Sequence, residues 1–196
     1  LLNDLDIELT KEGLDTRIVF LSYLELLWTA KKEKIKNPDR FILLFAPIRR
    51  PYWEPLSHQT KGEKLPFIRN AYKNPCDNFS GLHYFNDWKK EFPGECIIFD
   101  YPLMWDMYRD MTGESVAKMA GLDAADMQKL GFDGNISCQN LRLDMIGALA
   151  MRLMRLAFWK GQIDLEAETA KFYAECYAED GVAVQNVLRI VRKALN

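Results

Sequence analysis

Short apolar runs recur along the first two thirds of the chain, and polar or turn residues bound each of them. They are RIVFLSY, RFILLFAP, CIIFDY and GNISCQ. Runs of this length that contain β-branched and aromatic residues are typical of buried parallel strands. The pattern therefore predicts four strands, at residues 17–23, 40–47, 96–101 and 134–139.

Apolar residues at helical spacing separate and follow these runs. Segments 81–91 and 124–130 predict helices between strands, and segment 24–36 predicts a short or irregular connection. Three amphipathic helices without intervening strands are predicted at the end of the chain, at residues 145–159, 165–177 and 182–195. Alternating strands and helices indicate βα units, which form a parallel sheet through right-handed crossovers.

The chain length and the number of predicted strands together restrict the folds that the chain can adopt. A closed eight-stranded βα barrel requires about 200 to 250 residues, and the chain has 196. The sequence therefore predicts an α/β fold in which a parallel four-stranded half of a TIM barrel spans 1–142 and C-terminal helices spanning 143–196 pack on it. An open flavodoxin-like sheet is the alternative, but neither a GxGxxG nor a Walker loop follows any strand.

The two ends of a half-barrel would leave open edges and an apolar inner surface. We expect Phe20, Leu43 and Ile98 to face other strands across the barrel interior. Apolar residues already recur at helical spacing from the first residue, so we expect the chain to be a piece of a longer protein. The open edges then predict a homodimer of two half-barrels or pairing with the missing N-terminal half. The alternative is a monomer whose C-terminal helices fold over the open surface.

Charge and cysteine content exclude several classes of function. Lys and Arg total 26 against 28 Asp and Glu, so the chain lacks the excess positive charge that nucleic acids and anionic membranes attract. No apolar run reaches the length of about 20 residues that spans a bilayer. The four cysteines and two histidines show no metal-ligand spacing, which predicts free thiols, no metal and no cofactor.

Polar and aromatic residues follow the ends of all four predicted strands, where barrel active sites are built. Flat aromatic rings can stack on sugar faces, and amides and charged groups can bind sugar hydroxyls, so this composition favours a carbohydrate ligand. The candidate substrate-binding residues are Tyr23, Arg49, Arg50, Tyr52, Tyr101, Trp105, Gln139, Asn140 and Arg142.

Two carboxylates at these strand ends, Glu25 and Asp100, are the candidate catalytic residues. An inverting glycosidase holds its two carboxyl groups about 6.5–9.5 Å apart. Simpler roles remain open: Asp100 can bond neighbouring loop amides, and Glu25 can face solvent. Arg49 and Arg50 can bind the carboxylate of a uronic acid, or an ion pair with Asp100 can hold the loop instead.

Three segments resemble a known family. LLNDLDIELTKEGLDTRIVFLSYLELLW, NPDRFILLFAPIRRPY and LGFDGNISCQNLR resemble the bacterial family of uncharacterised α-glucuronidase-like TIM-barrel proteins, a domain of unknown function. The run FWKGQIDLEAETAKFYAECYAEDG resembles that family's closing helices. The resemblance implies a TIM-barrel domain, of which this chain would be the second half, and a carbohydrate-related role. It assigns no catalytic residue.

Three functional hypotheses follow from the strand-end residues and the resemblance. The first is a glycosidase that acts on a uronic-acid-containing glycan by carboxylate acid/base hydrolysis. The second is a carbohydrate-binding barrel without catalysis, which retains the aromatic and arginine residues but has no carboxylate pair at catalytic separation. The third is a scaffold domain whose strand-end residues pair only with each other.

Overall fold

The computed structural model describes residues 1–58, 62–70, 73, 75–104, 110, 112–138 and 145–195, and for residues 145–147 it describes the backbone alone. The chain divides into two compact units. Unit 1 comprises Leu1–Pro51, His58–Asp100 and Gln128–Ile136. Unit 2 comprises Tyr52–Ser57, Tyr101–Met127 and Ser137–Asn196.

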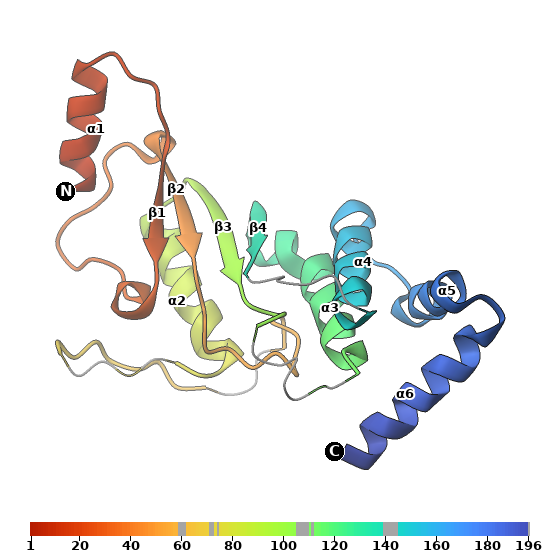
Figure 1. Ribbon diagram of the computed structural model, residues 1–196. Coiled ribbons are helices and arrows are strands. Elements are labelled where there is room, and N and C mark those ends of the chain that lie inside the picture. Colours follow the sequence, from red (N-terminus) through yellow and green to blue (C-terminus); the bar gives the residue numbers. More distant parts are fainter. Residues whose placement is uncertain are drawn as a thin grey trace. The chain divides into compact units, whose positions relative to one another are not determined.

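Four strands form one sheet in the order β1-β2-β3-β4 (Figure 1). The strands are β1 (Ile18–Ser22), β2 (Phe41–Phe45), β3 (Glu95–Asp100) and β4 (Gly134–Ser137). The helices are α1 (Leu2–Lys11), α2 (Asn78–Glu91), α3 (Glu114–Leu130), α4 (Met145–Lys160), α5 (Leu165–Tyr177) and α6 (Gly181–Leu195). The α/β class and the parallel four-stranded sheet are confirmed, and each strand ends within two residues of its predicted bounds.

Two helices begin earlier than the apolar spacing predicts, because side-chain caps extend them. The Asp77 carboxylate accepts a hydrogen bond from the Ser80 backbone N–H at 2.7 Å, and α2 begins at residue 78 instead of 81. The Asp110 carboxylate accepts from the backbone N–H groups of Ser115 and Val116, and α3 begins at residue 114 instead of 124.

Helix α2 covers one face of the sheet through a layer of aromatic rings. The Phe20 ring of β1 lies 5.1 Å from the Phe92 ring and 5.6 Å from the Trp88 ring, centroid to centroid. The Phe45 ring of β2 lies 5.3 Å from the Phe85 ring of α2. Rings at these separations and angles add favourable contacts to the burial of their apolar surface. This layer is the core of unit 1.

The prediction that Phe20, Leu43 and Ile98 face a barrel interior is wrong. Phe20 is level with Leu43, and Ile98 is level with Phe45, so all three lie on the face that α2 covers. Leu43 and Ile98 are fully buried there. The sequence could not separate the two faces because both carry apolar side chains, so alternation between polar and apolar positions is missing.

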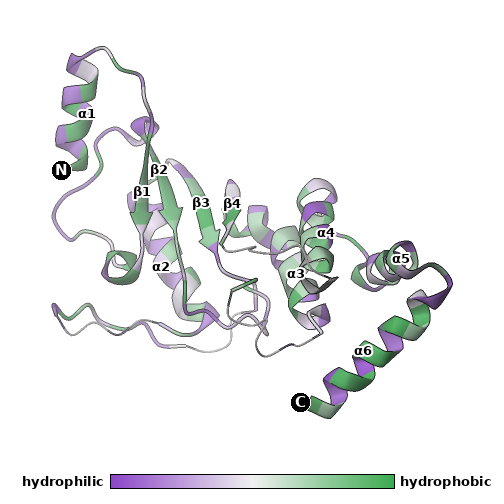
Figure 2. Cartoon of the chain, in the orientation of Figure 1, coloured by the Kyte–Doolittle hydropathy of each residue, from purple (hydrophilic) through white to green (hydrophobic). Residues whose placement is uncertain are grey.

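The opposite face of the sheet, which we call the open face, is apolar but only partly buried. Its residues are Val19, Leu21, Ile42, Leu44, Ile97 and Ile136. The exposed fractions of Val19, Leu21 and Ile136 are 51%, 44% and 43%. Parallel sheets are normally buried on both faces. The apolar character of β2 and β3 is visible in Figure 2.

Unit 2 has its own helical core, built from α3, α4 and α5 around Leu149, Leu153 and Phe172. Gly121 allows α3 to lie close to Leu165 of α5, since a Cβ at residue 121 would lie 2.8 Å from Leu165 Cδ2. Helix α6 is amphipathic, and Val184 and Leu188 pack against this core. Among the described residues, no helix is both long and apolar enough to cross a membrane.

Two of the cysteines, Cys96 and Cys176, differ sharply in environment. Cys96 is fully buried in β3, and burial raises the pKa of its thiol to about 11. At pH 8 only about a thousandth of this thiol would be the reactive thiolate. We expect a thiol reagent such as dithionitrobenzoate to modify the exposed Cys176 rapidly and Cys96 only after unfolding in urea. Peptide mass spectrometry checks this, and rapid modification of Cys96 in the native protein would contradict it.

Candidate functional site

The predicted strand-end site contains a buried ion pair. The Arg50 guanidinium donates two hydrogen bonds to the Asp100 carboxylate, from Nε to Oδ1 at 2.9 Å and from Nη2 to Oδ2 at 2.6 Å. The exposed fractions of the two side chains are 1% and 2%. This geometry matches the bidentate pairing of guanidinium with carboxylate. Of the two roles left open for Arg50, the ion pair that holds the loop after β2 is the one observed.

Among the other described strand-end residues, Arg49 lines a small cavity together with Arg50. The Tyr52 hydroxyl accepts a hydrogen bond from the Tyr101 backbone N–H at 2.9 Å, and both residues are buried in unit 2. Arg49 is exposed beside a cavity of about 10 Å³, which has room for about one water molecule. Tyr23 is half-buried at the start of a 3₁₀ helix, Leu24–Leu27. Four further candidates, Trp105, Gln139, Asn140 and Arg142, lie outside the described residues.

Glu25 lies elsewhere in unit 1, at a cavity of about 790 Å³ that we call the aromatic cleft. Three segments line it: residues 25–31 after β1, the loop residues 64–67, and Tyr84 and Asp87 of α2. Its volume is within the range of about 300–1,000 Å³ that is common for small-molecule sites. Asp100 does not line this cleft, so the two predicted catalytic carboxylates have different surroundings.

Three aromatic side chains frame the aromatic cleft. The Trp28 ring lies 5.0 Å from the Tyr84 ring and 5.6 Å from the Phe67 ring. The Leu65 carbonyl accepts hydrogen bonds from Trp28 Nε1 at 2.9 Å and from the Tyr84 hydroxyl at 2.8 Å. A tyrosine hydroxyl is protonated at neutral pH and can donate, and burial raises the pKa of Tyr84 further. These two hydrogen bonds hold the loop against α2 and against the segment after β1.

Charged side chains surround this frame. Lys64 Nζ lies 2.5 Å from Asp87 Oδ2, and His83 Nε2 lies 3.5 Å from the same atom. Partial burial alone would raise the pKa of Asp87, but the hydrogen bond and charge of Lys64 outweigh it and hold that pKa below its usual value. Glu25 and Lys31 are exposed at the cleft, and within the described part of the chain neither forms an ion pair.

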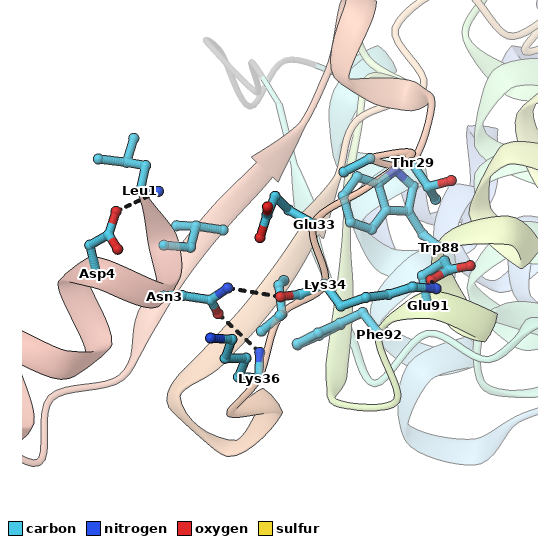
Figure 3. A pocket seen from close by; sticks show the side chains of 13 residues that line it. Leu1, Asn3, Asp4, Thr29, Glu33, Lys34, Lys36, Trp88, Glu91 and Phe92 are labelled. Atoms are coloured by element: carbon cyan, nitrogen blue, oxygen red, sulfur yellow. Dashed lines mark hydrogen bonds and ion pairs between the residues drawn. The ribbon is translucent and has the colours of Figure 1, made fainter.

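A second cavity, the α1 cleft, has a volume of about 560 Å³ and lies between α1, residues 33–36 and α2 (Figure 3). Trp88 and Phe92 form its aromatic side. Asn3 donates a hydrogen bond to the Lys34 carbonyl and accepts one from the Lys36 backbone N–H, which joins α1 to the segment after β1.

Trp28, Phe67 and Tyr84 were not predicted from the sequence, because none of them directly follows a strand. Trp28 follows the short 3₁₀ helix, Phe67 lies in a proline-containing loop, and Tyr84 lies within α2. The position of Trp28 shortly after the first strand was the one signal in the sequence that could have indicated the aromatic cleft. Across the described ranges, no group of three or more His, Cys, Asp or Glu side chains is arranged to hold a metal ion.

Comparisons of the chain with protein-family models, with curated proteins and with solved structures returned no match.

The buried Arg50–Asp100 pair predicts a large effect on stability. Asp100→Asn is expected to lower the free energy of unfolding by about 3–5 kcal/mol, because the neutral amide no longer balances a buried guanidinium charge. Urea denaturation measures this effect. Glu95→Gln is the matched control, since it removes the exposed Arg17–Glu95 pair at 2.8 Å and should cost about 0–1 kcal/mol. Equally small losses in both variants would contradict a structural role for the buried pair.

Proposed function

We propose that the chain binds carbohydrate and that the aromatic cleft is the ligand site. The supporting observation is the combination of an aromatic frame with exposed charged side chains around one cavity of ligand size. Sugars present apolar ring faces that stack on aromatic side chains and hydroxyl groups that need polar partners. The cleft offers both kinds of partner within one structural unit.

Individual residues suit these two roles. Phe67 is 41% exposed and Trp28 is half-buried, so their rings are available as platforms for a sugar ring. Glu25 can accept hydrogen bonds from hydroxyls, and Lys31 can donate to hydroxyls or to the carboxylate of a uronic acid. Lys64 and Asp87 already pair with each other, so they support the wall of the cleft.

Binding is favoured over the glycosidase activity expected from the sequence. Hydrolysis by acid and base requires one carboxyl group whose pKa is raised so that it donates a proton. The described carboxylates at the aromatic cleft are Glu25 and Asp87, and the pKa of Asp87 is lowered. Asp87 therefore suits a fixed negative charge better than a proton donor.

We also propose that the sheet is half of a TIM barrel, as the sequence analysis expected. Strands that are neighbours in sequence are neighbours in the sheet. Right-handed crossovers between such neighbours place all connecting segments on the same face, and a sheet of this type buries its other face by closing on itself. The apolar open face is the surface that would become the barrel interior.

A second copy of the chain is the partner we propose for the open face. An identical half supplies four strands of equal length and an equally apolar surface. A twofold arrangement would cover both open faces and pair both sheet edges without further sequence.

The proposed dimer predicts a mass of twice 22.8 kDa in sedimentation equilibrium. Val19→Lys places a charge on the open face and should shift the chain to monomer, because burying an unpaired ammonium is unfavourable. Phe158→Lys is the control, since Phe158 is similarly exposed but belongs to unit 2. A wild-type chain that stays monomeric up to high concentration would overturn pairing through a second copy.

The proposed carbohydrate site predicts a specific loss of binding. Calorimetric titration of the folded chain would use cello-oligosaccharides and oligogalacturonates, which represent neutral and acidic glycans. Phe67→Ala should weaken binding at least tenfold because it removes a stacking surface, whereas Phe158→Ala, an equally exposed phenylalanine outside the cleft, should have no effect.

Absence of binding to both series by a chain whose circular dichroism confirms folding would overturn the proposed function. Release of reducing sugar in the same samples, if Glu25→Gln abolishes it, would replace binding by hydrolysis as the activity of the cleft.

A further inference from the structure

The aromatic cleft and the α1 cleft adjoin each other. Both are lined by Thr29 and Ala30, so the two cavities lie on either side of one short segment of the chain. The side chains of these two residues are small, and Ala30 is exposed. At these two positions the segment that both cavities share carries no bulky side chain.

The two cavities repeat the same kind of surface. Each has an aromatic wall, which is Trp28 with Phe67 in the aromatic cleft and Trp88 in the α1 cleft. Each also has exposed charged side chains at its edge; in the α1 cleft these include Glu33 and Lys36. Within the described residues no ion pair engages the Glu33 or Lys36 side chain.

The geometry points to an extended site for a linear oligosaccharide, with one subsite in each cleft and the chain of the ligand crossing Thr29 and Ala30. This inference rests on the proposed carbohydrate binding and adds the class of ligand. Each cavity alone has the volume of a small-molecule site, so together they exceed what a single sugar residue fills. Two linked subsites also raise affinity, because a ligand bound at one is held close to the other.

The dependence of affinity on ligand length tests this inference. Cello-oligosaccharides and oligogalacturonates of one to six residues would be titrated calorimetrically into the full chain. In the series that binds, affinity is expected to rise at least tenfold between two and six residues. The double variant Glu33→Ala/Lys36→Ala should weaken binding of the six-residue ligand at least threefold and leave the two-residue ligand unchanged.

Glu179→Ala/Lys193→Ala is the matched control, because it removes one acidic and one basic exposed side chain from unit 2. Equal affinity for two- and six-residue ligands would overturn the extended site while the proposed function stands. Equal weakening of both ligands by Glu33→Ala/Lys36→Ala would also overturn it. Absence of binding at every length would overturn the proposed function itself, and the extended site with it.

Discussion

The packing of α2 on one face of the sheet is the contact on which the rest of unit 1 depends. Phe85 and Trp88 of α2 face the rings of β1 and β2. Tyr84 and Asp87, one position earlier in each case, line the aromatic cleft. One helix therefore contributes to both the core and the candidate site. A shift of α2 along the sheet would move the cleft residues Tyr84 and Asp87.

The one-sided arrangement of the sheet is the second constraint. A parallel sheet gains most of its stability from burial of both faces, and here α2 covers one face while Val19, Leu21 and Ile136 remain exposed on the other. Strands that are consecutive in sequence are also neighbours in the sheet. The open face is apolar over three or more strands. Its exposure to water is therefore energetically unfavourable.

The elements that depend on local sequence were predictable, and those that depend on tertiary contacts were not. All four strands were found because runs such as FILLF are apolar over their whole length. The same uniformity concealed which face α2 covers. The first turns of α2 and α3 were missed because they depend on carboxylate caps instead of apolar spacing.

The candidate site, like the fold, was predictable only in part. The sequence placed Arg50 and Asp100 at neighbouring strand ends and left open whether they pair, which is a question of side-chain geometry. The aromatic cleft joins residues 28, 67 and 84, and no strand-end rule connects these positions. Their proximity comes from the fold of the loop against α2, for which the sequence pattern has no local signal.

The hydrogen bonds at Leu65 have a consequence for how this loop tolerates change. The acceptor is a backbone carbonyl, which every residue type possesses, whereas the two donors are the side chains of Trp28 and Tyr84. Mutational libraries that vary residue 65 and its exposed neighbours would keep the anchor, because no substitution removes the carbonyl. Sequence drift should therefore concentrate in the loop and spare the two donors, so that the cleft can acquire new specificities while its frame is preserved.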